Sequence, residues 1–406
     1  MPLEILAFMF LGILFGIVTG LIPGLHPNTV FAIILSLSYL FLQFPLVYTL
    51  TFIISLAVTN VFIDFIPSII FGAPDPDNCM SVLPGHQLLM EGRGYEAVFL
   101  SVTGGVAAVL ITTLTLPVLL FTTPFLYSHI HKIIHILLSI VVMWMVWSEK
   151  NKTHALLIFI LTGTLGLLSL NAYPSGLVLF PALTGLFGIS GLVISFYGNQ
   201  NLPEQKKMHK PKTEGIKGSI TGWFAGMLAG ILPGIGSSQA ATIVSQIFKS
   251  KAKGFLTALG SINAANIIFT LIAFYTLGKT RSGATATISQ LTPTLSINEL
   301  ILLMMVALTT TLVSAVITLK IAHRILSKLS SINYRKLNLF VILFLIASII
   351  ALTGVIGLVI AFTGTMIGIL TIKTGVKRSN MMGFLVFPTI LYFSGLLPLF
   401  SFVLKI

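Results

Sequence analysis

Two proline-glycine pairs, each followed by small polar side chains, are the residues in this sequence whose types and spacing best suit the binding of a solute. Pro23-Gly24 leads into LHPNT, and Pro233-Gly234 leads into IGSSQ. Both pairs interrupt long apolar runs, and a helix that starts again after such a break presents N–H groups whose partial positive charge favours anions. The candidate binding residues at the breaks are Pro23, Gly24, His26, Asn28, Thr29, Pro233, Gly234, Gly236, Ser237, Ser238 and Gln239. The alternative is a pair of kinks that serve packing only.

Two asparagines lie inside apolar runs at matching places, ahead of a second pair of irregular segments. They are Asn60 and Asn266. The segment that follows Asn266, LGKTRSGATATIS (277–289), contains Arg281 and Ser282. Because arginine pairs well with a carboxylate or a phosphate, these four residues are also candidate substrate contacts.

Three aspartates are candidates for coupling transport to an ion. Asp75 and Asp77 lie in FGAPDPDNCMSVLPG (71–85), where they could bind Na⁺ or carry a proton, or could lie in a solvated loop. Asp64 lies in VTNVFIDFIPS, between apolar neighbours. An ionised carboxylate is costly to bury in lipid, so Asp64 should face the protein interior or an aqueous cavity.

The composition places this chain in a membrane. Of 406 residues, 56% are hydrophobic and only 8% are charged, whereas a soluble domain usually has about a quarter charged residues. Apolar runs of roughly 20 residues, long enough to cross a bilayer as helices, recur along the whole length. The net charge of +13 comes from basic residues in short loops between these runs. That is the pattern of the positive-inside rule, and it requires no nucleic acid partner.

Other chemistry finds little support in the sequence. Cys79 is the only cysteine, so a disulfide framework and a cysteine metal cluster are excluded. His129, His131 and His135 have no carboxylate cluster beside them, so no metal site is expected. The sequence contains no GxxxxGK[ST] motif for a nucleotide, which argues against direct ATP coupling. We expect no enzymatic activity; an intramembrane hydrolase using Asp64, Asp75 or His26 is a remote alternative.

An internal repeat organises the chain. Five residues of the first half, Gly12, Gly16, Gly20, Pro23 and Gly24, match Gly222, Gly226, Gly230, Pro233 and Gly234 at an offset of 210. Asn60 and Gly72 match Asn266 and Gly278 at an offset of 206. We therefore divide the chain into a first repeat (1–198), a polar cytoplasmic linker (199–217) and a second repeat (218–406).

The charges of matching loops predict that the two repeats are inverted. Lys249, Lys251 and Lys253 follow the second proline-glycine segment, whereas the matching stretch 43–47 has no charge. A basic loop in one half faces a neutral loop in the other, as expected for halves inserted upside down relative to each other. This predicts an all-α membrane protein in which each half is a re-entrant helical hairpin followed by about five crossing helices.

The predicted boundaries follow from the apolar runs. The first hairpin is expected over 3–43. The crossing segments are expected at 46–70, 96–124, 136–148, 154–170, 174–196, 254–277, 297–319, 337–352, 354–372 and 380–404. The protein would be a multi-pass cell membrane protein with both termini outside.

Several motifs together resemble the large membrane subunit family of tripartite tricarboxylate transporters, most closely its shorter archaeal-type members. They are PGLHPNT (23–29), FGAPDPDNCMSVLPGHQLLMEGRGYEAV (71–98), GLFGISGLV (185–193), PGIGSSQAAT (233–242) and INAANII followed by SGATATI (262–288). The resemblance implies a carrier for small carboxylates driven by a Na⁺ or proton gradient. It also implies a small membrane subunit and an extracytoplasmic binding protein as partners.

The chain departs from the larger family members at His26, at Asp75-Pro76-Asp77 and at Lys279-Thr280-Arg281, and it is shorter. These changes fall in the presumed site, so the resemblance leaves the substrate open. The predicted function is a secondary transporter for a small organic anion, with Na⁺ as a possible coupling ion, no other cofactor and a possible homodimer. A translocase for a phosphorylated polyprenyl lipid is the alternative, because Lys279 and Arg281 could also serve a phosphate.

Overall fold

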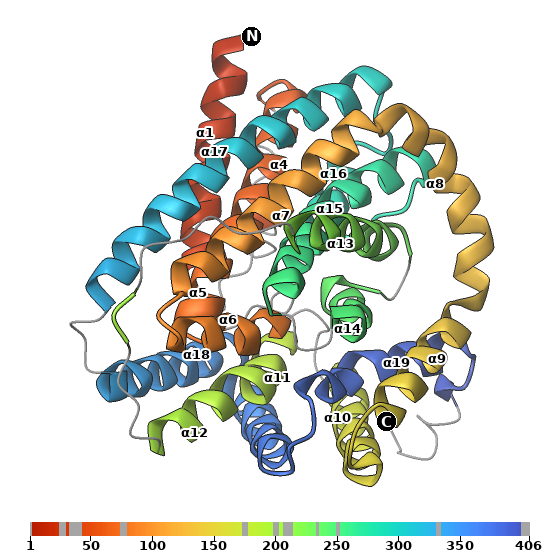
Figure 1. Ribbon diagram of the computed structural model, residues 1–406. Helices are drawn as coiled ribbons and strands as arrows, with labels where there is room; N and C mark the ends of the chain where they lie inside the picture. The colour runs from red at the N-terminus through yellow and green to blue at the C-terminus, as the bar shows by residue number, and fades with distance from the viewer. Residues whose placement is uncertain are drawn as a thin grey trace.

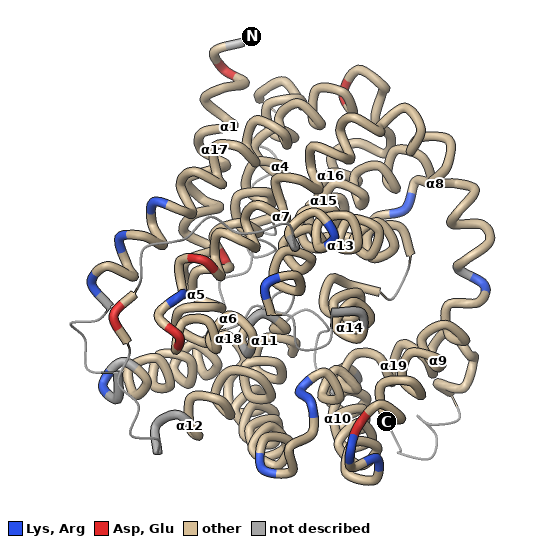
Figure 2. The backbone as a smooth tube through the Cα atoms, in the orientation of Figure 1, with Lys and Arg blue, Asp and Glu red and all other residues tan. Residues whose placement is uncertain are grey.

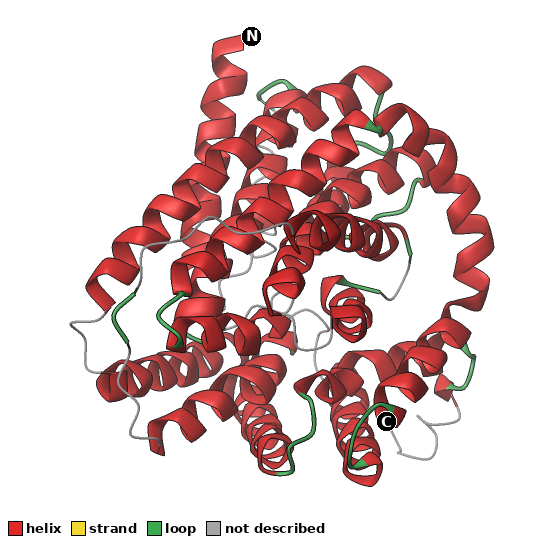
Figure 3. Ribbon diagram, in the orientation of Figure 1, coloured by secondary structure: helices red, strands yellow, loops and turns green. Residues whose placement is uncertain are grey.

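The computed structural model consists of helices joined by loops, with no strand among the residues that it describes (Figure 1; Figure 3). The described residues are 2–23, 30–31, 43–73, 79–172, 178–197, 203–205, 214–232, 235–248, 252–329 and 334–398. The prediction of an all-helical protein is therefore confirmed over this part of the chain.

Seven helical stretches in the described ranges are long and apolar enough to cross a membrane. They lie in α1 (Pro2–Leu21), α4 (Leu46–Ile63) with α5 (Phe65–Ile70), α7 (Gly94–Leu114), α10 (Lys152–Ala172), α15 (Ala252–Leu277), α17 (Ile297–Leu329) and α18 (Tyr334–Lys373). Two further helices, α8 (Leu116–Ile130) and α9 (Ile134–Trp147), meet at a bend of 75° through η2 (His131–Ile133). Taken as one broken span, this pair brings the number to eight.

Shorter elements fill the space between the long helices. In the first half they are η1 (Cys79–Ser81), α6 (Val82–Met90), α11 (Leu179–Leu183), the π-helix η3 (Thr184–Ile189) and α12 (Ser190–Tyr197). In the second half they are α13 (Glu214–Ile231), α14 (Ser237–Phe248), α16 (Gly283–Leu291), η4 (Arg378–Met382) and α19 (Gly383–Phe393). The two arms of the second predicted hairpin are α13 and α14. Most of the second arm of the first hairpin, after Pro23, lies outside the described residues.

Of two predicted crossing boundaries with a clear local cause, one differs from the structure and one agrees with it. The segment 96–124 is divided between α7 and α8, because Pro117 has no N–H for the carbonyl of Thr113 and so interrupts the helical ladder. The predicted division between 337–352 and 354–372 coincides with a break in α18, because the backbone is not helical at Gly354, where φ is 62°. A positive φ of this kind is readily adopted only by glycine.

The outer helices expose large apolar side chains to the surroundings. Leu3 in α1 is 78% exposed, Phe121 in α8 is 82% exposed and Val355 in α18 is 74% exposed. A soluble monomer rarely exposes apolar patches that extend over several helices. These surfaces therefore face lipid, and the protein is a multi-pass membrane protein.

The internal repeat reappears as two helix pairs packed through glycine. On α1, a Cβ at Gly12 would lie 2.6 Å from the Phe52 carbonyl oxygen of α4, and Gly16 and Gly20 lie against the next turns. On α13, Gly222, Gly226 and Gly230 lie in the same way against α15. Gly20 meets the carbonyl of Asn60, and Gly230 meets the carbonyl of Asn266. The packing thus follows both offsets found in the sequence, 210 for the glycines and 206 for their partners.

Helices of each half also pack against helices of the other half. α7 of the first half packs on α15 of the second, where Gly104 lies against the Thr257 carbonyl and Gly260 lies against the Ser101 carbonyl. α17 of the second half packs on α4 of the first, where Thr310 Oγ1 donates to Ser55 Oγ at 3.2 Å. α10 likewise packs on α19, and α18 packs on η3. The halves are therefore interlocked and form one body.

Basic segments from distant parts of the sequence meet at one end of the molecule. Tyr95, at the start of α7, contacts His323, near the end of α17, with ring centroids 5.8 Å apart. The Gly94 N–H donates to Gln205 Oε1 of the linker at 3.0 Å. Lys253, at the start of α15, pairs with Glu96 at 3.0 Å. Figure 2 shows that the basic end of α17 lies on the same side as the charged residues near α5 and α6.

Alanine substitutions at two glycines of α13 should have opposite effects on stability, because one glycine is tightly packed against α15 and the other is not. At Gly226 a Cβ would lie 2.5 Å from the Ile262 carbonyl oxygen, whereas at Gly215 on the same helix it would meet nothing within 4 Å. We expect Gly226→Ala to lower the free energy of unfolding by about 1–3 kcal/mol. Gly215→Ala should be neutral or stabilising by up to about 1 kcal/mol. Thermal unfolding of both variants in detergent measures this, and equal midpoints would contradict the close packing.

Candidate functional site

The predicted site residues divide into those that the structure describes and those that it does not. Gly24, His26, Asn28, Thr29, Asp75, Asp77, Pro233 and Gly234 lie outside the described residues. Pro23, Asn60, Asp64, Gly236, Ser237, Ser238, Gln239, Asn266, Arg281 and Ser282 lie within them.

The start of α14 brings five of the predicted residues together. The helix begins at Ser237, directly after the second proline-glycine break, and Ser237 and Ser238 are only 1% and 2% exposed. Gln239 Oε1 accepts a hydrogen bond from the Gly236 N–H at 3.0 Å and so caps one of the free N–H groups of this end. Asn266 Nδ2 of α15 donates to Ser237 Oγ at 3.0 Å. A helix N-terminus is thus buried among amide and hydroxyl groups.

Asn60, the counterpart of Asn266, makes a different contact. Its Nδ2 donates to Thr19 Oγ1 of α1 at 3.2 Å. The residue that matches Thr19 at the offset of 210 is Ala229, which has no hydroxyl group. Asn266 therefore has no such partner on α13 and bonds to α14 instead. Asn60 fastens a helix pair within the first half, while Asn266 fastens the broken helix of the second half.

Ser282 starts a second short helix beside α15. It is the N-cap of α16 and forms a capping box with Thr285. Its Oγ lies 3.1 Å from Thr270 Oγ1, and Thr270 lies one turn beyond Asn266 on α15. The starts of α14 and α16 therefore bind neighbouring turns of the same helix.

Arg281 is directed elsewhere. Its guanidinium lies 5.7 Å from the ring centroid of Tyr127 in α8, and its Nη2 donates to the Tyr127 hydroxyl at 3.4 Å. Cation–π contacts of this kind hold an arginine against an aromatic face. The side chain thus contacts α8 rather than the start of α14.

Asp64 is only 6% exposed and lies at the joint between α4 and α5. Its backbone continues the helical ladder, because its N–H donates to the Asn60 carbonyl at 2.9 Å. At the offset of 206, Asp64 matches Thr270. The prediction that Asp64 faces the protein interior is confirmed, while its role in ion coupling stays a prediction.

The structure adds η1, from the motif 71–85, and η4, which no motif singled out, to the surroundings of this helix start. Cys79 of η1 lies with its Sγ 3.4 Å from Ser238 Oγ, and its Sγ also contacts Met382 Sδ of η4 at 3.9 Å. Both η1 and η4 pack on α14, and η1 also packs on η3. The buried start of α14 is therefore surrounded by segments of both halves.

Two titratable side chains accompany these segments, and sequence reasoning missed both. Arg378 begins η4 and donates from Nη1 to the Phe187 carbonyl of η3 at 3.3 Å. His86 lies on α6, where burial and, second, the charge of Arg378 lower its pKa to about 4, against a hydrogen bond to the Ile69 backbone. Burial lowers the pKa of Arg378 to about 10. In the sequence, TGVKRSN around Arg378 resembles any other basic loop, so only the fold reveals this arrangement.

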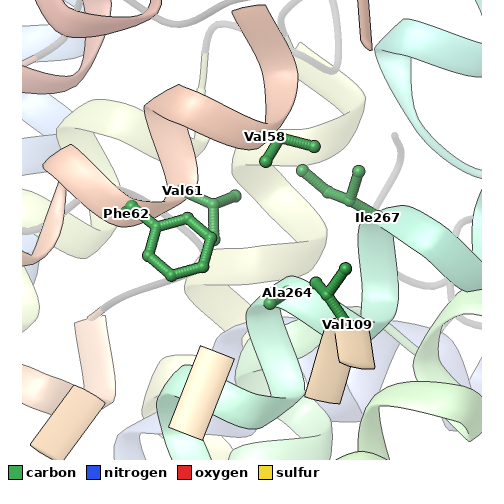
Figure 4. A pocket seen from close by; sticks show the side chains of 6 residues that line it. All are labelled: Val58, Val61, Phe62, Val109, Ala264 and Ile267. Carbon is green, nitrogen blue, oxygen red and sulfur yellow. The ribbon is translucent and has the colours of Figure 1, made fainter. Parts of the chain in front are cut away.

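A small apolar pocket between α4, α7 and α15 is not a binding site (Figure 4). Its lining consists of Val58, Val61, Phe62, Val109, Ala264 and Ile267. It has no polar surface and no room for a water molecule. Among the described residues there is also no group of three or more His, Cys, Asp or Glu side chains that could hold a metal ion.

The low pKa of His86 gives the protein a specific acid sensitivity. Between pH 6.5 and 4, the imidazole of His86 is protonated in the unfolded chain but stays neutral in the folded protein. The folded state should therefore lose stability as the pH falls through this range, by up to about 3 kcal/mol. We expect His86→Gln to reduce this loss, as measured by thermal unfolding at pH 7, 6 and 5. An unchanged slope would show that His86 is not buried in its neutral form.

Comparisons with known proteins agree with this architecture. The Tripartite tricarboxylate transporter TctA family matches residues 6–383 of the chain. An uncharacterised protein of Methanocaldococcus jannaschii is 32% identical over 401 residues, which cover 96% of this chain and 98% of that protein. No solved structure matches. The chain belongs to the tripartite tricarboxylate transporter TctA family.

Proposed function

We propose that this protein is a secondary active transporter that carries a small organic anion, a carboxylate, by alternating access with Na⁺ or proton coupling. The observation that carries the proposal is the start of α14, a helix N-terminus buried after a proline-glycine break and surrounded by Ser237, Ser238 and Asn266. Free N–H groups and the helix dipole attract an anion there. Broken helices of this kind mark substrate sites in transporters built from repeats.

The direction of matching helices supports an inverted arrangement of the two halves. α7 and α17 are counterparts at the offset of 206, since Gly104 and Thr310 both lie where their helix crosses the other half. The start of α7 contacts the end of α17 through Tyr95 and His323, so the two helices run antiparallel. In this arrangement the hairpins enter from opposite sides, and each half in turn can open the site.

The gathering of basic segments supports an orientation. The linker, Arg93, Lys253 and the last turns of α17 lie at one end, and basic segments favour the cytoplasmic side. We infer that this end is cytoplasmic and that both termini are outside. The tripartite character of the family further suggests a small membrane subunit and an extracytoplasmic binding protein as partners.

Cysteine labelling tests the orientation. In a Cys79→Ser background, Glu204→Cys places a thiol in the linker and Thr294→Cys places one before α17, at the opposite end; both positions are exposed. With an impermeant maleimide on intact cells, we expect labelling at position 294 and none at 204 until the cells are opened. The reverse pattern would overturn the inferred orientation.

Uptake into proteoliposomes tests the function. We expect radiolabelled citrate or succinate to accumulate when a Na⁺ or proton gradient is imposed and to stop when the gradient is dissipated. Ser237→Ala and Asn266→Ala should reduce uptake by roughly tenfold each, because each removes a group at the buried helix start. Ser289→Ala, a hydroxyl that bonds only within α16, serves as the control. Absence of uptake for every carboxylate, with flipping of a polyprenyl phosphate instead, would replace this proposal by the lipid translocase.

A further inference from the structure

Arg378 is a cation inside a helix junction, with a single hydrogen bond to a carbonyl and no anionic partner in the described part of the chain. Its Nη1 donates to the Phe187 carbonyl at 3.3 Å, and no described carboxylate lies within ion-pair distance of it. The cations at the basic end differ, because Arg93 and Lys253 both pair with Glu96, at 2.8 and 3.0 Å. A charge withdrawn from water without a counterion is costly, so its retention here points to an anion that binds and leaves.

The first half of the chain builds a receptacle around this guanidinium. Phe187 lies in the π-helix η3, a rare geometry that is frequent at functional sites. Gly191 faces the same group, and a Cβ there would lie 3.3 Å from Arg378 Nη2. His86 is a titratable neighbour that is neutral near pH 7, so it adds no competing charge. The next residue along the chain, Lys377, is paired with Glu149 at 3.9 Å. The Arg378 side chain keeps partial exposure, which a solute needs in order to reach it.

The receptacle adjoins the start of α14. η4, which begins with Arg378, packs on α14, and its last residue, Met382, contacts Cys79. Cys79 in turn contacts Ser238, the second residue of α14. Arg378 therefore lies at the junction of both halves, on a short element whose last residue reaches the segments around the start of α14.

We propose that Arg378 is the charged anchor of the substrate site and binds a carboxylate of the transported anion, between η3 of the first half and α14 of the second. This inference rests on the proposed function and adds to it a recognition residue. The planar guanidinium matches a carboxylate with two parallel hydrogen bonds, and it has donors to spare beyond the one that Phe187 accepts. Because Arg378 belongs to the second half and its neighbours Phe187 and Gly191 belong to the first, an anion bound there bridges the two halves.

Stabilisation by ligand is the first test. Wild-type protein in detergent, titrated with citrate and with succinate, should rise in unfolding temperature, since the ligand binds the folded state. In Arg378→Gln the concentration for half the effect should rise at least about 30-fold, the loss typical of removing one partner of a buried charge pair. Arg378→Lys should be intermediate, because an ammonium keeps the charge without the fork. The control Lys373→Gln, an exposed cation at the end of α18, should stay within about twofold. Citrate binding within twofold of wild type in Arg378→Gln would overturn the proposal.

Chemical protection provides a readout that needs no variant. Phenylglyoxal modifies accessible arginines, and the adducts are located by mass spectrometry. Citrate should protect Arg378 but not Arg324, an exposed arginine on α17. If carboxylates are transported but neither protect nor require Arg378, the anchor is wrong and the proposed function stands. If only vesicles containing a polyprenyl phosphate protect it, the anchor stands and the carboxylate function is wrong. Protection by neither refutes the anchor.

Discussion

Close contact of helix backbones through glycine is the constraint on which the rest of this structure depends. In lipid there is little hydrophobic drive to hold helices together, so association relies on shape and on hydrogen bonds. The glycines of α1 and α13 allow α4 and α15 to approach until a methyl group would clash with a carbonyl. That approach brings polar side chains of neighbouring helices within hydrogen-bonding distance of each other. Asn60 can thereby reach Thr19, and Asn266 can reach the start of α14.

The broken helix of the second half is held by a partner for one of its free backbone groups and by contacts to two of its side chains. Irregular backbone at membrane depth persists only where it is buried in protein or lines a cavity. Gln239 caps the Gly236 N–H, Asn266 holds Ser237 and Cys79 contacts Ser238. The partners come from three elements, one of which belongs to the first half. A break that would be unstable in an isolated hairpin is thus stabilised by the interlocked halves, and the same burial gives the helix dipole its strength.

Packing of helices from one half against the other explains how charged residues that are distant in sequence come close together. α7 packs on α15 and α18 packs on η3, so segments that are distant in sequence become neighbours. Arg378 meets the Phe187 carbonyl for this reason. The basic end of the molecule arises similarly, since Gln205, Lys253 and His323 all contact the first residues of α7. Two zones of charge result. At the basic end Arg93 and Lys253 pair with Glu96, whereas beside η3 Arg378 has no described carboxylate within ion-pair distance, although its neighbour Lys377 pairs with Glu149.

The membrane class, the helical content and the matching glycines of α1 and α13 could all be determined from the sequence alone, because apolar runs and glycine spacing are local patterns. The position of the second break and the polar residues after it were also predicted. Tertiary structure alone decided which helices of one half pack on the other half, because contacts between segments distant in sequence leave no periodic pattern. Tertiary structure also gave Asn60 and Asn266 different partners, because Thr19 offers a hydroxyl group where its counterpart Ala229 has none. It further placed Arg281 against Tyr127. It also placed Arg378, since a basic residue in a loop is ordinarily solvated, and only the surrounding fold withdraws it in part from solvent.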